Sequence, residues 1–285
     1  MTHLVTVGGW DRPHPATSLT GAQWWAVWKA WNAKVASAAA VLGAPSSFAG
    51  FDGIDWDVEG VDTQSSSDNT FPLTLLHLMG DMSTAAKADG YSVSLTPCES
   101  YLDVYNYYFD FSLKHAYLEY PEFPYHGENT YAYLVAKYPD AWDIISVQLY
   151  ESWSHANYQI SEVKVPASAF LQMWARQIMH GWYVNFALTP GIDIASQYVK
   201  VPPQKLVLGL ANGWTGSTTN SSKVKALYIP SAEVADAIVG LNSSNASLAL
   251  RGVMFWSIKY EGMPINGSTT PVWLAKEMND VLHVR

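Results

Sequence analysis

Charge is scarce in this sequence. Of its 285 residues, 16 are Lys or Arg and 25 are Asp or Glu, so 14% are charged, against about 25% in a typical soluble domain. The net charge of −9 argues against nucleic acid as a partner, because phosphate binding needs clustered Lys and Arg. Aromatic residues also reach 14%, and hydrophobic residues reach 49%, which is enough for a core. This composition favours a neutral ligand with flat faces.

Cysteine and long apolar runs are also scarce. Cys98 is the only cysteine, so no disulfide can form within the chain. No run of 18 apolar residues predicts a membrane span, and the N-terminus has no signal-peptide pattern, so we expect no membrane partner. N-glycosylation sequons, which favour an extracellular or secretory-pathway location, begin at Asn220, Asn242, Asn245 and Asn266.

Short apolar runs alternate with longer helical stretches along the chain. This alternation predicts an α/β fold with a parallel sheet, in a single domain over residues 1–285. The strand-like runs are 4–7, 51–57, 92–96, 144–150, 206–210 and 252–257. Helices are predicted over 73–82, 170–179 and 232–239. Connections 99–142 and 151–204 are long, and loops of that length usually carry function.

Two further helices have specific signals. Trp24, Trp25, Trp28 and Trp31 follow helical spacing, which predicts a helix packed on the sheet. Near the C-terminus, a Thr-Pro pair at 270–271 predicts the cap and first turn of the last helix.

The segment from residue 52 to residue 59 carries four carboxylates in eight residues. Asp55, Asp57 and Glu59 alternate, so on an extended strand they point to one side, with successive side chains about 6.6 Å apart. Carboxylates crowded in this way repel, and at least one is expected to hold a proton near neutral pH. A protonated carboxyl is what a general acid needs.

A metal site explains these acids less well. Asp55, Asp57, Glu59 and Gly60 match the start of a calcium-binding EF-hand loop, but its twelfth position would be Ser66 instead of Glu, and the preceding run is strand-like. The eight histidines are scattered without ligand spacing. We therefore expect no metal and no cofactor.

The acidic segment resembles the Asp-x-x-Asp-x-Asp-x-Glu motif of the chitinases of glycoside hydrolase family 18. Asp52, Asp55, Asp57 and Glu59 take its four positions. Three other segments are similar to family motifs in the family's order. They are Thr6 to Trp10 on the third barrel strand, Gln148 to Tyr150 on the sixth and Met254 to Ser257 on the eighth. Leu208 to Leu210 resembles the seventh strand, and Glu151 departs from the Asp or Asn usual at its position.

The resemblance implies a TIM (β/α)8-type barrel. The family's third-strand motif begins here at residue 6, so strands one and two of the barrel are expected to be missing from this chain. Six strands would remain, and the first and last would leave exposed edges.

The resemblance also implies roles for individual residues. Glu59 would be the proton donor, and Asp57 would hold the substrate's acetamido group with Asp55 as its carboxylate partner. Tyr150 would bond the acetamido oxygen, and Trp256 would stack beneath the −1 sugar. Further substrate contacts are expected from Asp52, Gln148, Met254, Gly9 and Trp10, and candidate sugar platforms are Trp10, Tyr101, Trp153 and Trp214.

Three functions fit these residues. The leading hypothesis is a chitinase that hydrolyses β-1,4 links between N-acetylglucosamine units by a retaining, substrate-assisted mechanism, with chitin or chitooligosaccharides as its partner. An endo-β-N-acetylglucosaminidase acting on N-glycans would share the carboxylate motif. A chitinase-like lectin would bind without cleaving, but such proteins commonly lose the terminal Glu of the motif, and Glu59 is intact.

Overall fold

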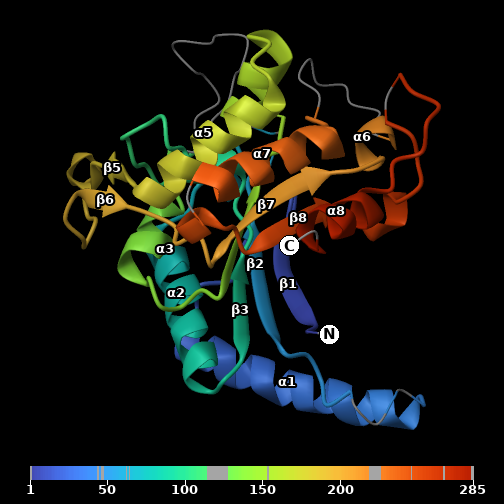
Figure 1. The fold of residues 1–285 in the computed structure, drawn as a ribbon. Helices are drawn as coiled ribbons and strands as arrows, with labels where there is room; N and C mark the ends of the chain where they lie inside the picture. Colours follow the sequence, from blue (N-terminus) through green and yellow to red (C-terminus); the bar gives the residue numbers. More distant parts are fainter. Residues whose placement is uncertain are drawn as a thin grey trace.

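The protein is built around one six-stranded parallel sheet, shown in Figure 1. The computed structural model describes residues 2–43, 45, 48–61, 63, 65–113, 128–152, 154–217, 226–244, 246–265 and 267–283. The strand order is β1-β2-β3-β4-β7-β8, so each strand of the sheet lies beside the previous one in the chain. The strands are β1 Leu4–Gly9, β2 Gly53–Val58, β3 Ser92–Leu95, β4 Ile144–Gln148, β7 Leu206–Ala211 and β8 Gly252–Trp256.

All six predicted strands are confirmed, and so is the α/β class. The outer strands β1 and β8 do not pair with each other among the described residues, so the sheet is open, with two edges. Burial follows this arrangement: β7 is buried along its whole length, whereas β1 and β8 contain no buried residue. The structure thus has the strand order of a TIM-type barrel without its closure.

Helices connect the strands. They are α1 Gly21–Val41, α2 Leu73–Ala88, α3 Ala132–Lys137, α4 His155–Asn157, α5 Ala167–His180, α6 Trp214–Ser217, α7 Ser231–Ser244 and α8 Leu274–His283. The predicted helices of residues 73–82, 170–179 and 232–239 are confirmed as α2, α5 and α7. Of the glycosylation sequons, Asn242 is exposed on α7, and the other three asparagines lie outside the described residues.

The tryptophan stripe forms α1 as predicted, but the helix does not pack on the face of the sheet. Figure 1 shows α1 crossing the end of the sheet at which β1, β2 and β3 begin. Trp25 and Trp28 stack on each other and meet the edge of Tyr91, just before β3, while Trp31 stacks on Phe51, just before β2. The stripe therefore covers the residues that lead into the strands.

Two other predictions need correction. The last helix begins at Leu274, so Thr270 and Pro271 do not cap it; Pro271 instead forms a short antiparallel bridge with Pro264. The connection over 151–204 contains an antiparallel hairpin, β5 Trp182–Val184 and β6 Gln197–Val199, which the sequence did not predict. Three-residue strands are too short to establish an alternating pattern.

Side chains on β2 alternate between two environments. Ile54, Trp56 and Val58 are buried toward the helices, and the indole of Trp56 donates a 2.8 Å hydrogen bond to Ser83 on α2. The carboxylates between them point to the opposite, inner face of the sheet.

No helix within the described part of the chain is long and apolar enough to cross a membrane.

The glycine pair that ends β1 has a structural reason. Gly8 adopts φ +112, a backbone conformation that side chains other than glycine rarely take. A Cβ atom on Gly8 would lie 2.3 Å from the carbonyl oxygen of Asp57 on β2. Glycine here allows β1 to approach β2 at the level of the carboxylates.

Candidate active site

The inner face of the sheet lines a cavity of about 780 Å³. Much of its wall is made by every second residue of β1, β2, β3, β4 and β8, as expected where alternate side chains point inward. The lining residues that follow this alternation are Thr6, Gly8, Asp55, Asp57, Ser94, Thr96, Ser146, Gln148 and Met254. The cavity reaches the carboxyl ends of the strands, where the catalytic sites of barrels lie.

Asp55 is the first of the three alternating acids along β2 and is fixed by hydroxyl groups. Thr96 on the neighbouring segment donates to Asp55 Oδ1 at 2.6 Å, and Thr6 on β1 donates to Asp55 Oδ2 at 3.0 Å. Both carboxylate oxygens are therefore occupied. Asp55 supplies fixed negative charge beneath Asp57.

Gln148 joins the other two acids. Its side-chain Nε2 donates to Asp57 Oδ1 at 2.8 Å and to Glu59 Oε1 at 3.1 Å, and it also donates to the carbonyl of Thr96 at 3.0 Å. The amide lies between the two carboxyl groups and fixes their relative position. A side chain predicted as a substrate contact thus also organises the acids.

One of the crowded acids holds a proton, as the sequence predicted. Burial raises the pKa of Asp57 to about 11, and the charge of Glu59, a hydrogen bond with Glu59 and the charge of Asp55 raise it further, whereas Gln148 opposes the shift. The Asp57–Glu59 pair therefore carries one proton at neutral pH.

The thiol of Cys98 contacts Glu59. Its sulfur donates to Glu59 Oε2 at 3.2 Å. Burial raises the pKa of Cys98 well above its usual value, and the charge of Glu59 adds to this effect, so the thiol keeps its proton and remains a donor. Together with Gln148, it gives each oxygen of Glu59 a defined partner.

The backbone around Glu59 is also held. The imidazole of His14 donates to the carbonyl oxygen of Glu59 at 2.9 Å, and Tyr131 donates its hydroxyl hydrogen to the carbonyl of Val58 at 2.5 Å. Glu59 itself is 6% exposed, so it faces the cavity from a rigid, buried position.

Aromatic side chains form the rest of the wall. Trp256, at the end of β8, is 49% exposed although it lines the cavity, so its ring is available to a ligand. Tyr150 follows β4 and meets Trp214 edge-on, with ring centroids 5.8 Å apart. Asn212 fixes the backbone after Trp256 by donating to the carbonyl of Ser257 at 2.8 Å and accepting from its N–H at 3.2 Å.

A fourth acid, Glu151, lines the cavity beside Tyr150. Its Oε1 accepts a 2.6 Å hydrogen bond from the backbone N–H of Ser100. Burial raises the pKa of Glu151 to about 8, so this carboxyl is largely neutral at pH 7. The residue that departs from the family pattern therefore adds a hydrogen-bond donor to the wall.

Most of the sequence-predicted site residues meet in this one cavity. Its lining includes Glu59, Asp57, Asp55, Tyr150, Trp256, Gln148, Met254, Gly9, Trp10 and Trp214. Sequence reasoning missed Thr96, Cys98 and Arg12, which also line it. Thr96 and Cys98 follow β3, and the rule that strand ends share one edge of a sheet could have found them.

Two predicted contacts are wrong. Asp52 precedes β2, at the opposite end of the strand from the site, and accepts a 2.7 Å hydrogen bond from the N–H of His3. Tyr101 is fully buried; its ring meets Phe71, and its hydroxyl accepts from the N–H of Gly60 at 2.9 Å, so it cannot stack on a sugar. Trp153 lies outside the described residues.

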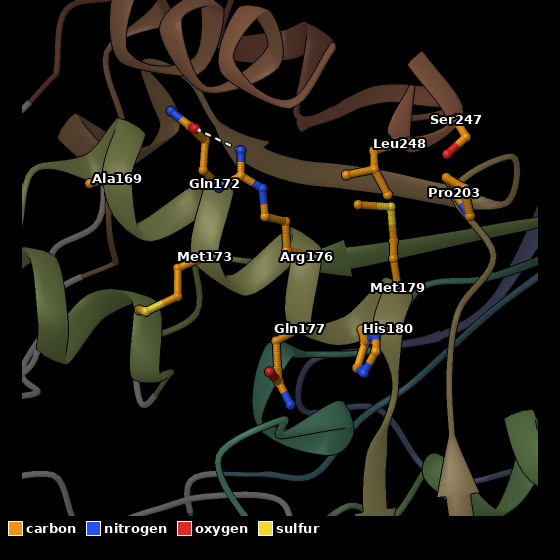
Figure 2. A pocket seen from close by; sticks show the side chains of 10 residues that line it. All are labelled: Ala169, Gln172, Met173, Arg176, Gln177, Met179, His180, Pro203, Ser247 and Leu248. Carbon is orange, nitrogen blue, oxygen red and sulfur yellow. Dashed lines mark hydrogen bonds between the residues drawn. The ribbon is translucent and has the colours of Figure 1, made fainter. Parts of the chain in front are cut away.

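A second cavity, of about 910 Å³, lies away from the strand ends. Figure 2 shows its wall, where Arg176 of α5 donates a 3.3 Å hydrogen bond to Gln172 one turn earlier. Met179 and Leu248 supply apolar surface. None of the described residues that line it carries a carboxylate, so this part of the wall offers no carboxyl group to act as an acid or a base.

Comparisons with known proteins give weak matches. No family model matches the sequence, and neither does any curated protein. Among solved structures, the Legionella pneumophila ChiA C-terminal domain is 18% identical with a TM-score of 0.45, over 74% of this chain and 61% of that one. A GH18 chitinase from Pseudoalteromonas aurantia is 16% identical with a TM-score of 0.44, over 98% and 74%.

An Ostrinia furnacalis Group IV chitinase in complex with allosamidin is also 16% identical, with a TM-score of 0.44, over 99% of this chain and 79% of that one. The chain thus spans less than two thirds of the first of these structures and about three quarters of the other two. At these identities and TM-scores, the similarity does not show which activity this protein has.

Proposed function

We propose that this protein is a glycoside hydrolase that cleaves β-1,4 links between N-acetylglucosamine units in chitin or chitooligosaccharides. The observation that carries the proposal is the arrangement of Asp57, Gln148 and Glu59. Two carboxyl groups share one proton under a bridging amide, in a cavity walled by Tyr150 and Trp256.

The cavity suits a neutral sugar. The half-exposed ring of Trp256 offers a flat apolar surface to one face of a pyranose, and hydrogen-bonding groups opposite it suit the ring's hydroxyl and acetamido groups. Among the described lining residues Arg12 is the one basic side chain. Of the four acids, Glu151 is largely neutral and Asp57 shares a proton with Glu59, so two negative charges stand against one positive charge. A site of this charge favours positive charge that develops on the ligand.

The proposed mechanism uses the substrate's own nucleophile. Common glycosidases place two carboxylates on either side of the bond, and family 18 is a substrate-assisted exception. The oxygen of the 2-acetamido group attacks the anomeric carbon while the bond to the leaving oxygen breaks. The leaving oxygen takes from Glu59 the one proton that Glu59 shares with Asp57, so both carboxyl groups end this step ionised. The product of this step is a cyclic oxazolinium ion, still bound in the cavity.

Asp57 and Tyr150 assist this step. Asp57 orients the acetamido N–H and stabilises its developing positive charge, and Tyr150 donates to the acetamido oxygen. Burial raises the pKa of Tyr150 well above its usual value, so its hydroxyl stays protonated. Glu59, now ionised, removes a proton from the water that opens the oxazolinium, and the β configuration is restored.

Turnover of chitohexaose tests the proposal. We expect hydrolysis by the unaltered protein and a loss of about 10²- to 10⁴-fold in kcat for Glu59→Gln, with chitohexaose affinity retained by calorimetry. Glu233→Gln, on α7 and away from the residues that line the cavity, is the matched control and should keep full activity. Binding without any turnover would make the protein a lectin, and cleavage of an N-glycoprotein but not of chitohexaose would make it an endo-β-N-acetylglucosaminidase; either result rejects the proposal.

A further inference from the structure

A second group of ionisable side chains lies behind the cavity wall. Glu99 and Asp103 follow β3, and His155 is the first residue of α4, which follows β4. Glu99 and Asp103 are fully buried, and His155 is 8% exposed. One ligand atom of each residue lies within 4.8 Å of the other two, and His155 Nδ1 is 3.0 Å from Asp103 Oδ1. None of the three lines the cavity.

The charges of this group do not balance. Two ionised carboxylates carry two negative charges, and a protonated imidazole supplies one positive charge. Buried carboxylates are stable only when they are paired, protonated or bound to a metal.

One oxygen of Glu99 has no partner. Its Oε2 accepts a 2.7 Å hydrogen bond from the backbone N–H of His155, so the carboxyl group is turned toward α4. Its Oε1 is buried without a hydrogen-bond partner in the described structure. Leaving such an oxygen unsatisfied is costly, and a bound cation would remove that cost.

We propose that Glu99, Asp103 and His155 bind one divalent cation of the zinc class. Two carboxylate oxygens and an imidazole nitrogen are ligands that Zn²⁺ accepts, with a water molecule or another donor at the fourth tetrahedral position. Mg²⁺ and Ca²⁺ prefer oxygen ligands alone, so the imidazole disfavours them. Spacing along the sequence did not predict this group, because its members come from the segment after β3 and from the start of α4, which meet only in the fold.

The site would stabilise the wall of the cavity that holds Glu59. Cys98, next to Glu99, contacts Glu59, and the N–H of Ser100 holds Glu151. A cation that joins the loop after β3 to α4 fixes the backbone carrying both contacts. Its role is structural, and it does not depend on the proposed glycosidase activity.

Metal binding by the whole chain tests this proposal. Protein dialysed against a chelator and then against buffer would be titrated separately with Zn²⁺, Mg²⁺ and Ca²⁺, and bound metal measured by mass spectrometry. We expect one Zn²⁺ per chain, a higher Tm with Zn²⁺, and no response to Mg²⁺ or Ca²⁺. Co²⁺ should give the visible absorption of a tetrahedral site with a nitrogen ligand.

Two variants locate the binding. Glu99→Gln and Asp103→Asn preserve shape, and each should abolish stoichiometric Zn²⁺ binding. Asp143→Asn is the matched control; Asp143 is a half-buried carboxylate paired with Lys87 elsewhere in the fold, and its loss should leave Zn²⁺ binding unchanged. Absence of Zn²⁺ binding in the unaltered protein overturns the proposal without any variant. Binding that survives both substitutions, with the fold intact by circular dichroism, assigns the metal to another site and also overturns it.

Discussion

The proton on Asp57 should make the protein less stable as the pH rises. The folded state keeps this proton up to a pKa of about 11, whereas an unfolded chain releases it near pH 3.8. Between pH 5 and 8 the folded state therefore binds one proton more, and the free energy of unfolding falls by as much as about 1.4 kcal/mol per pH unit. Over three units this amounts to about 4 kcal/mol, an upper value because Asp57 keeps some surface in the cavity.

Asp57→Asn should remove this slope. Asparagine can accept from Gln148 and donate to Glu59 without an ionisable proton, so the variant should gain stability over the parent from pH 5 to pH 8. Urea unfolding at pH 5, 6, 7 and 8 measures the difference. Glu151, whose pKa is also raised, lowers stability with rising pH in both proteins and cancels.

Asp193→Asn is the control, because the pKa of Asp193 is lowered in the folded protein whereas that of Asp57 is raised. Burial opposes ionisation of Asp193, but hydrogen bonds from Lys137 and Tyr133 lower its pKa to about 2. The stability it contributes is present above pH 3.8 and is lost only as the pH falls further. Asp193→Asn should therefore shift the whole curve from pH 5 to 8 without changing its slope. Equal slopes for Asp57→Asn and the parent would refute a proton on Asp57.

Three other experiments test the ligand-binding wall, the packing of β1 on β2 and the role of the substrate's acetamido group. Trp256→Ala should weaken chitohexaose binding about 10- to 100-fold, from the loss of about 1–3 kcal/mol of aromatic contact, whereas Trp273→Ala, exposed at the start of α8, should leave calorimetric affinity unchanged. Gly8→Ala should cost about 2–4 kcal/mol in urea unfolding, because it adds a clash with Asp57 to an unfavourable φ; Gly43→Ala, with a similar φ but open space, should cost less. Oligomers of glucosamine without acetyl groups should not be cut, and their hydrolysis, seen by chromatography, would rule out the acetamido nucleophile.

The strands could be predicted because their apolar runs are short and bounded by polar or turn-forming residues. The same alternation placed Asp55 and Asp57 on the inner face, since a strand leaves only two directions for a side chain. Asp52 is outside the cavity for a different reason. It lies just before β2, at the end of the strand opposite the site. Asp52 matches the motif along the sequence, but it does not line the cavity.

Loop residues escaped prediction for a physical reason. Tyr101 follows β3 in a 3-10 turn, Glu99–Leu102, where no fixed period predicts the direction of a side chain. Its ring is buried, whereas that of Trp256, at the end of a strand, is exposed. The meeting of Glu99 with His155 depends on β3 and β4 being neighbours, which spacing along the chain does not show. The position of α1 was not predicted because a stripe of tryptophans shows which face of a helix is buried, but not which part of the sheet that face contacts.

The configuration of the first product tests the proposed mechanism most directly. Chitohexaose would be incubated with the protein in the NMR tube, and the anomeric proton signals of the new reducing ends recorded before they equilibrate. Attack by the substrate's acetamido oxygen, followed by water, predicts the β anomer in excess at the earliest times. An initial excess of the α anomer would contradict the account and would require a water held for direct displacement.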